Sequence, residues 1–437
     1  MCARVCYTAY SEVVKMKDKV FTVAIIGCGS RGCDAYGSLM RGMPDKYKVT
    51  AMCDINPAKL DKYAPVFGIA QENRFDTEEA FFAAKRAEVL VIATPDACHI
   101  RQGIKGLELG YDVLVEKPLS ASEKECADLL AAQKKYGGKV MVCHVLRYAK
   151  GFTRVAELIE NGVIGELVSI QALEQVTYWH QAHSYVRGNW RRSEDTTPMI
   201  LAKCCHDLDL LQYYARSKCA SVSSTGDLKF FNRAHQPQGA ADRCMQCKYI
   251  ESCPYSAKRL YIDNWKNAGK PENCWPYNVI TLKVPLTEDA LAEAVQNGPY
   301  GRCVFACDNN VVDHQIVQMQ FNNGVNASLT MTAFTANGGR IMRFFGTQGE
   351  IVLNEEEDAI HVKPFGKPAE TTRISAATEG GHAHGGGDFG LITALYKTLT
   401  GEQTAATSLE ASIESHLMGI AAEKSRRSGG ACVQVHA

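Results

Sequence analysis

Three glycines follow a short apolar run near the start of the chain. In the stretch VAIIGCGSRG, residues 23–32, Gly27, Gly29 and Gly32 have the spacing G-x-G-x-x-G. After a buried strand, the first glycine permits a tight turn, the second lets backbone N–H groups approach a pyrophosphate, and the third lets a helix pack on the strand. The same spacing also occurs in plain turns, so its meaning depends on the elements around it.

An acidic residue ends the next apolar run. Asp54 closes the stretch VTAMCD, where a carboxylate can accept hydrogen bonds from both hydroxyls of an adenosine ribose and would repel a 2′-phosphate. The sequence therefore predicts that the turn, including Ser30 and Arg31, binds NAD, with NADP the less favoured cofactor. Arg31 is a basic side chain near the turn that could offset the repulsion.

Two further polar stretches follow later apolar runs. ATPDACH contains Thr94, Pro95 and His99, and VEKPLS contains Glu116 and Lys117. Because open α/β sheets bind ligands at the carboxyl ends of their strands, we expect these five residues to bind the cofactor. The alternatives are a solvated surface turn for the Glu-Lys pair and a helix-end cap for the histidine.

A region dense in aromatic, basic and imidazole side chains begins at residue 179, in WHQAHSYVRGNWRRSEDTTPMILAKCCHDLDLL. Planar rings can stack on sugar faces while Arg, Asn and His donate to hydroxyls, so the region predicts a carbohydrate site. The predicted substrate-binding residues are His183, Tyr185, Trp190, Arg191 and Asp207. The alternative is a polar surface loop with a few core histidines.

Cysteines cluster in RCMQCKYIESC, with the spacing C-x2-C-x5-C. Such a pattern is typical of half of a structural zinc site, which needs a fourth ligand. The predicted metal ligands are Cys244, Cys247, Cys253 and Cys303. Cys274 and Cys307 are alternatives for the fourth position, and an iron–sulfur cluster or free reduced thiols are alternatives to zinc.

The elements that must position these groups follow from the hydrophobic pattern. Short β-rich runs alternate with amphipathic segments, which predicts an α/β domain with a parallel sheet over residues 17–145. The runs are FTVAIIG, KVTAMCD, VLVIAT, DVLVE and KVMVCH. Residues 146–437 predict a second, α+β domain whose late strands alternate as in an antiparallel sheet, with a Cys-rich insertion at about 226–299. Near its end, glycines and Asp388 mark a helix start, suited to capping or to a loop over a pocket.

Together, GCGSRG, ATPDACH, VEKPLS and CHVLRYAKGF resemble the Gfo/Idh/MocA family of oxidoreductases, from about residue 21 to 354. The resemblance implies a Rossmann domain, a second domain with a large, mostly antiparallel open sheet, and a homodimer or homotetramer. It also implies NAD(P)-linked hydride transfer at a sugar or polyol carbon. Lys117 would be the active-site lysine, Arg147 would lie near the cofactor, and His206 would be the acid–base residue.

The chain departs from the family at one position. Many inositol dehydrogenase-like members have an aspartate four residues before the histidine, where this chain has Ala202 followed by Lys203. A lysine next to that position could bind an anionic group or stabilise an enolate, so Lys203 joins the predicted catalytic residues. Three functions stay open: a sugar dehydrogenase, an NAD-dependent glycoside hydrolase or lyase acting through a 3-keto sugar, and a cofactor-binding regulator without catalysis.

Composition narrows the class of partner. The 437 residues carry 48 basic and 48 acidic side chains, and this balance does not favour nucleic acid or an anionic membrane as a partner. Apolar runs fall short of the roughly 20 residues of a membrane helix, and the first residues lack a secretory signal. A cytoplasmic protein with reduced cysteines is therefore expected.

Overall fold

The computed structural model describes residues 19–272, 274–375 and 384–436. The described residues form two compact units, one made of those within 19–156 and 375–416 and the other of those within 157–374 and 417–436. The first unit therefore takes in a segment from late in the chain. The domain boundaries at 17–145 and 146–437 stay a prediction.

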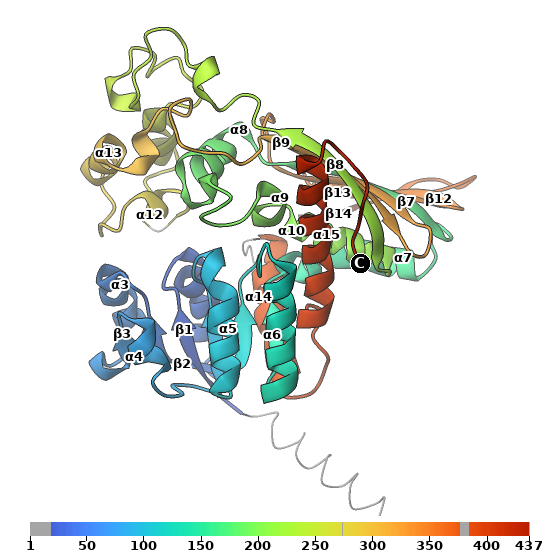
Figure 1. Ribbon diagram of the computed structural model, residues 1–437, viewed down its shortest axis with the longest axis horizontal. Helices are drawn as coiled ribbons and strands as arrows, with labels where there is room; N and C mark the ends of the chain where they lie inside the picture. The colour runs from blue at the N-terminus through green and yellow to red at the C-terminus, as the bar shows by residue number, and fades with distance from the viewer. Residues whose placement is uncertain (1–18, 273, 376–383, 437) are drawn as a thin grey trace, which may run out of the picture. The chain divides into compact units, whose positions relative to one another are not determined.

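Within the described part of the first unit, six strands form a parallel sheet in the order β3-β2-β1-β4-β5-β6 (Figure 1). The strands are β1 (Phe21–Ile26), β2 (Tyr47–Cys53), β3 (Arg74–Phe75), β4 (Val89–Ile92), β5 (Asp112–Val115) and β6 (Val140–Val142). All four residues of β4 are buried, as expected for a parallel sheet covered on both faces. The predicted parallel α/β domain is confirmed.

Helices connect these strands, and one helix comes from late in the chain. The helices of this unit are α2 (Ser38–Arg41), α3 (Pro57–Phe67), α4 (Glu78–Phe82), α5 (His99–Glu108), α6 (Glu123–Tyr136) and α14 (Gly387–Leu399). Helix α14 packs against α2 and the helical turn Ser30–Gly37. Two helices, α7 (Lys150–Glu160) and α15 (Leu409–Arg427), continue from this unit into the second.

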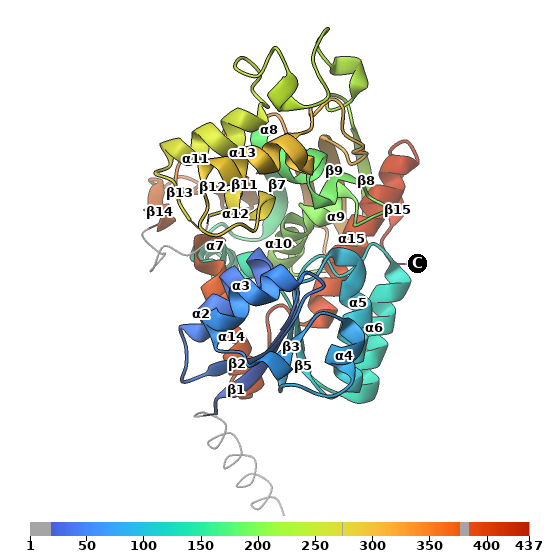
Figure 2. The ribbon, with the colours of Figure 1, turned by 90° about the vertical axis from the view of Figure 1, so that its left-hand side faces the viewer.

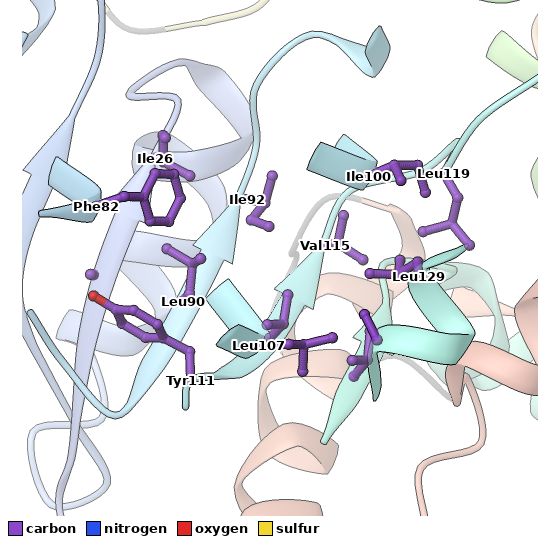
Figure 3. Packing of buried hydrophobic residues seen from close by; sticks show 14 of the residues in the cluster. Ile26, Phe82, Leu90, Ile92, Ile100, Leu107, Tyr111, Val115, Leu119 and Leu129 are labelled. Carbon is purple, nitrogen blue, oxygen red and sulfur yellow. The ribbon is translucent and has the colours of Figure 1, made fainter. Parts of the chain in front are cut away.

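Apolar side chains of the sheet and of α5 and α6 form one core. Leu90 and Ile92 of β4 and Val115 of β5 pack with Leu107 of α5 and Leu129 of α6, all at 1% exposure or less (Figure 3). Burial of these side chains is the main term that holds the two helices on the sheet. This core also supports the strand ends where the polar loops begin.

The second unit holds a mixed, mostly antiparallel sheet. Nine strands of its described residues lie in the order β14-β13-β12-β11-β7-β10-β9-β8-β15, and the β7–β10 pair alone among them is parallel. They are β7 (Leu167–Gln175), β8 (Cys219–Asp227), β9 (His314–Phe321), β10 (Asn326–Thr332), β11 (Gly339–Gly346), β12 (Gly349–Asn354), β13 (Ala359–Pro364), β14 (Glu370–Arg373) and β15 (Val433–Gln434). Buried and exposed residues alternate along β9, so the predicted antiparallel sheet is confirmed.

Short helices surround the segment where the insertion was predicted. The helices of the second unit are α8 (Tyr178–His180), α9 (Met199–Ala202), α10 (Cys205–Ala215), α11 (Asn264–Asn267), α12 (Tyr277–Ile280) and α13 (Glu288–Asn297). Between β8 and β9 the described residues form no strand, and α11, α12 and α13 gather there (Figure 2). Across the described residues, no helix combines the length and the apolar composition needed to cross a membrane.

Replacing Leu129 by alanine tests the core of the first unit. The buried side chain leaves a cavity, so we expect Leu129→Ala to lower the free energy of unfolding by about 2–5 kcal/mol in a denaturant titration. Val66→Ala is the control, because Val66 is 41% exposed and its loss should change stability by less than about 0.5 kcal/mol. Equal effects of the two substitutions would contradict this description of the core.

Candidate functional site

The glycine turn has the close contacts that its spacing predicts. Gly27 has φ +92°, and a Cβ there would lie 2.5 Å from the carbonyl carbon of Ala93. A Cβ on Gly32 would lie 2.2 Å from the carbonyl oxygen of Gly27, whereas one on Gly29 would meet no atom within 4 Å. Backbone at Gly29 is therefore open to a ligand, while the other two glycines permit tight packing.

The first helical turn after the glycines offers backbone donors. Residues 30–37 continue directly into α2, and Gly29 at the amino end has no side chain to cap the first N–H groups. Such free donors suit an anionic group such as a pyrophosphate. The turn thus fits a dinucleotide.

Asp54 lies where β2 ends, beside this turn. Its carboxylate is 6% exposed and accepts hydrogen bonds from the backbone N–H of Cys28 at 2.8 Å and of Asn56 at 2.9 Å. Lys59 Nζ lies 3.1 Å from the same group. Because each carboxylate oxygen has two acceptor positions, Oδ2 is fully used by Cys28 and Lys59, and one position remains on Oδ1 for a ribose hydroxyl.

Arg31 of the turn is held by two carboxylates. Its Nε donates to Glu116 Oε1 at 2.7 Å, and its Nη2 lies 2.7 Å from Asp388 Oδ1. Tyr36 Oη donates to the same Glu116 oxygen at 2.6 Å, and His384 Nδ1 lies 3.0 Å from Asp388 Oδ2. The guanidinium is thus neutralised within the protein, which weakens its capacity to attract a 2′-phosphate.

These ion pairs also affect the acids. Burial alone would raise the pKa of Glu116 and of Asp388. The nearby basic groups lower it: Arg31 and Lys117 act on Glu116, and His384 and Arg31 act on Asp388. Both pKa values are therefore held below their usual range. Both groups are therefore carboxylates at neutral pH. Asp388 lies in the first turn of α14 and pairs with Arg31, and the residue at the cap position is Gly386.

Histidines position the two strand-end loops. His99 is 1% exposed, with Nδ1 2.7 Å from the carbonyl oxygen of Pro118 and Nε2 2.8 Å from that of Thr94, so it links the ATPDACH and VEKPLS loops. His416 Nε2 accepts a hydrogen bond from the N–H of Leu119 at 2.8 Å. His99 contacts the protein through both ring nitrogens and supports the loop that carries Lys117.

The remaining predicted cofactor residues of the first unit lie at the same strand ends. Thr94 Oγ1 donates to Gln102 Oε1 at 2.6 Å, and Pro95 precedes the buried Asp96. Arg147 is 7% exposed and donates to the carbonyl oxygen of Ala406 at 3.2 Å. Their contacts to a cofactor stay a prediction.

In the second unit, four charged side chains form a buried ionic cluster. Arg340 of β11 and Glu174 of β7 are register partners, and Arg340 Nη2 lies 2.8 Å from Glu174 Oε2. Arg340 Nε lies 2.8 Å from Asp207 Oδ1 of α10, and Lys203 Nζ lies 2.9 Å from Glu174 Oε1. Lys203 and the first turn of α10, which contains His206, are therefore tied to the sheet.

The two acidic groups of this cluster have pKa values that are shifted in opposite directions. Burial raises the pKa of Asp207 to about 7, although the charge of Arg340 opposes the shift. Burial would also raise the pKa of Glu174, but Arg340 and Lys203 hold it below its usual value. Asp207, which follows the predicted acid–base residue His206 in the chain, is thus easier to protonate than a carboxyl group in water.

The predicted substrate-binding residues differ in accessibility. His183 is 2% exposed, its Nδ1 lies 2.9 Å from Tyr261 Oη, and burial lowers its pKa to about 3. Tyr185 is 4% exposed, whereas Trp190 is half-buried. Arg191 Nε lies 2.9 Å from Asp308 Oδ1. Trp190 and Arg191 are the more accessible of these, and contact with a substrate stays a prediction for all of them.

The four predicted metal ligands, Cys244, Cys247, Cys253 and Cys303, all line one cavity. Within the described ranges, however, no group of three or more Cys, His, Asp or Glu side chains is placed to hold a metal ion. Nothing here supports the prediction of zinc. Cys274 is exposed, and neither it nor Cys307 lines the cavity.

Several residues of these networks were not predicted from the sequence. They are Tyr36, Glu174, Arg340 and His416. Glu174 gives a usable signal, because it continues the inward period of Ile170 and Ala172 along β7 although it is charged. No comparable local signal marks the other three.

The pairing of Asp388 with Arg31 predicts a pH-dependent stability. Because the pKa of Asp388 is depressed on folding, its contribution is complete above the unfolded-state pKa of about 3.9 and is lost as pH falls through the folded-state value. We expect Asp388→Asn to lower the free energy of unfolding by about 1–3 kcal/mol at neutral pH, because Arg31 keeps its pairing with Glu116, with a smaller difference from wild type in acid.

Asp128→Asn is the matched control for this measurement. Asp128 pairs with Lys124 at an exposed position of α6, so the same chemical change should cost less than about 1 kcal/mol. A loss in Asp388→Asn that is equally small, or that does not change with pH, would contradict the described pairing.

Known proteins match both halves of the chain. Residues 21–144 match the family described as "Oxidoreductase family, NAD-binding Rossmann fold", and residues 156–435 match its "C-terminal alpha/beta domain". The putative oxidoreductase YteT of Bacillus subtilis is 23% identical over 406 residues, covering 87% of this chain and 89% of YteT. A 2,7-anhydro-N-acetylneuraminate hydratase of Mediterraneibacter gnavus is 23% identical over 265 residues, covering 61% of this chain and 65% of the hydratase.

A solved structure of levoglucosan dehydrogenase, in complex with NADH and levoglucosan, has the same fold. The TM-score is 0.70 at 18% sequence identity, and the match covers 96% of this chain and 100% of the levoglucosan dehydrogenase chain. The glycine turn, the Rossmann sheet and the open sheet agree with what the two family matches describe. The chain belongs to the Gfo/Idh/MocA family of NAD-binding oxidoreductases.

Proposed function

We propose that this protein transfers a hydride between a hydroxyl-bearing carbon of a sugar or sugar derivative and NAD. The observation that carries the proposal is the buried cluster of Lys203, Glu174, Arg340 and Asp207 beside His206, in a chain of an NAD-binding family. Oxidation of an alcohol releases a proton as well as a hydride, so an enzyme of this kind needs a group that exchanges protons near neutral pH. Several structural neighbours are named for sugars, among them levoglucosan and UDP-GlcNAcA.

The first unit would hold the cofactor. Bound NAD would supply the hydride acceptor for the reaction. The open backbone at Gly29 and the N–H groups that follow it would bind the pyrophosphate, and Asp54 would accept a hydrogen bond from a ribose hydroxyl. Arg31, paired with Glu116 and Asp388, supports NAD over NADP because its charge is already matched.

Two residues would act at the hydroxyl group of the substrate. His206 would take the hydroxyl proton, since imidazole exchanges protons near neutral pH. Lys117 would stabilise the negative charge that develops on the oxygen. Its loop is held by His99, His416 and the N–H of Lys117 itself, which donates to Glu116 Oε2 at 2.9 Å.

The second unit would bind the sugar. Trp190, one of the more accessible of the predicted contacts, would stack on the sugar, and Arg191 would donate to its hydroxyls. The buried Asp207, His183 and Tyr185 are the other proposed contacts. We also propose a homodimer or homotetramer and a cytoplasmic location, as the family resemblance implies. These assignments rest on residue chemistry and on relatives.

A redox-neutral reaction is the second candidate. Two relatives are named hydratases. Lys203 follows Ala202, the position where many inositol dehydrogenase-like members have an aspartate, and its ammonium lies 2.9 Å from the buried Glu174 carboxylate. Transient oxidation at a sugar carbon would acidify the neighbouring C–H bond, and Lys203 could exchange that proton before elimination and reduction. No net change of NAD would accompany such a cycle.

A substrate panel distinguishes these functions. The purified protein is mixed with NAD and free sugars, or with nitrophenyl glycosides, and both NADH absorbance and nitrophenol release are followed. NADH formation with a free sugar supports the dehydrogenase. Nitrophenol release without net formation of NADH supports the redox-neutral cycle. If neither product forms although NAD is bound, a non-catalytic cofactor-binding protein is supported.

Loss of the acid–base group should slow whichever reaction is found. We expect His206→Gln to lower kcat by about 10²- to 10⁴-fold, because proton transfer contributes that much to such reactions. Lys117→Met should also lower kcat strongly. His361→Gln, on strand β13 of the second unit, is the control and should leave kcat unchanged. Unchanged kcat in both His206→Gln and Lys117→Met would overturn the site assignment.

Cofactor preference tests the role of Asp54. Asp54→Ser removes a negative charge beside Lys59, whose ammonium then becomes free to attract a 2′-phosphate. We expect about tenfold weaker NADH binding and tighter NADPH binding in fluorescence titrations. Asp61→Ser, an exposed change on α3, should alter neither affinity. If the ratio of NADH affinity to NADPH affinity is the same in Asp54→Ser as in the wild type, Asp54 does not bind the ribose hydroxyls.

A further inference from the structure

The cavity lined by cysteines lies within the second unit, and much of its wall is apolar. Its volume is about 390 Å³, and protein pockets that hold small molecules span about 300–1,000 Å³. The aromatic and aliphatic side chains of the wall are Phe230, Ile250, Pro254, Tyr255, Val304 and Phe305. Among its lining residues there is none that we assign to the cofactor or to the sugar. The space therefore suits the apolar body of a separate small molecule.

A buried cation also lines the cavity. Arg187 is 1% exposed, and its guanidinium donates to the carbonyl oxygens of Arg302 at 2.7 Å and Tyr255 at 2.8 Å. Its Nη2 also lies 3.5 Å from Cys244 Sγ, and its Nη1 is buried without a hydrogen-bond partner among the described residues. The backbone thus fixes the position of the guanidinium and leaves one of its nitrogens unused.

The charge of Arg187 has no anionic partner among the described carboxylates. None of them forms an ion pair with it, and Asp308 pairs with Arg191 and Arg302 instead. The hydroxyl of Tyr261 acts on the guanidinium, but burial raises the pKa of Tyr261, so this group is neutral at neutral pH. A buried charge without a partner of opposite sign is costly, so an anion that enters the cavity would be stabilised there.

A second unused polar group lines the same cavity. Ser256 is 1% exposed, and its Oγ has no hydrogen-bond partner among the residues that the structure describes. It directly follows Tyr255, whose carbonyl oxygen accepts a hydrogen bond from Arg187. A serine hydroxyl can donate to an anion, as a guanidinium does. The wall therefore combines an apolar surface with two buried donors that lack acceptors.

We propose that this cavity binds a small carboxylic acid with an aromatic or aliphatic body. The carboxylate accepts hydrogen bonds from Arg187 and Ser256, and the body packs against the apolar wall, which includes Phe230 and Phe305. One guanidinium balances one negative charge, which a carboxylate carries, whereas a phosphate ester carries close to two at neutral pH. This binding is independent of the proposed hydride reaction.

The test titrates phenylacetate into the full chain in the presence of excess NADH, and ligand-observed nuclear magnetic resonance gives the dissociation constant. Phenylacetamide, which has nearly the same shape and no charge, is the matched control ligand. We expect phenylacetate to bind at least about tenfold more tightly than phenylacetamide, and more tightly than phenyl phosphate. No binding of phenylacetate, or equal binding of the acid and its amide, would overturn the proposal. Tighter binding of phenyl phosphate would overturn the choice of a carboxylate.

Variants then locate the site. Ala241 lines the cavity, so Ala241→Phe should fill it and abolish phenylacetate binding, and Ser256→Ala should weaken binding several-fold. Ala268→Phe is the control, because Ala268 is exposed and does not line the cavity, and this variant should bind as the wild type does. Unchanged binding in Ala241→Phe would show that phenylacetate binds elsewhere and would overturn the proposal. The comparison of acid and amide on the wild-type chain decides the role of charge even where a variant fails to fold.

Discussion

In each unit of the protein, one arginine held between two carboxylates joins segments that are far apart in the chain. In the second unit, Arg340 is 8% exposed and lies between Glu174 and Asp207. It thereby joins β11 and β7 to the first turn of α10, since the two strands and the helix each contribute one charge. Removing one partner from such a pair would leave a buried charge at a cost of about 3–5 kcal/mol. The position of His206 depends on this cluster, because Asp207 is its neighbour in the chain.

The first unit follows the same rule with different segments. Arg31 from the glycine turn meets Glu116 from the end of β5 and Asp388 from the start of α14, so residues more than 350 positions apart in the chain share one charge network. Helix α14 therefore belongs to the Rossmann unit although it follows the open sheet in sequence. A turn that binds a pyrophosphate needs a fixed backbone, and these ion pairs supply that rigidity.

Local patterns were enough to predict much of the fold and part of the candidate site. The glycine spacing and Asp54 have short-range causes, a tight turn and a strand end, and the structure shows both close contacts and the Asp54 hydrogen bonds. Period-two alternation along β9 likewise identified the antiparallel sheet. The patterns that predicted these features are local, although the contacts that result reach farther, from Gly27 to Ala93 and from Cys28 to Asp54.

Long-range partners could not be predicted in the same way. From the local sequence, Asp388 was predicted to cap a helix or to lie in a loop over a pocket. Its pairing with Arg31 depends on how distant segments of the chain meet, and no local pattern predicts that. Arg340 shows no local signal either, since its role comes from the register of β11 against β7. The cysteine spacing marked three thiols and left the fourth among several, and the structure places Cys244, Cys247, Cys253 and Cys303 around one cavity. Spacing alone does not determine how these sulfurs lie relative to one another.

The most direct test of hydride transfer follows the hydrogen itself. The protein is incubated with NAD and a sugar found in the panel, prepared with deuterium on its carbon atoms, and the NADH formed is analysed by mass spectrometry. The proposed reaction predicts that each NADH carries one deuterium taken from the sugar carbon. Consumption of the sugar with NADH that carries no deuterium would contradict direct hydride transfer.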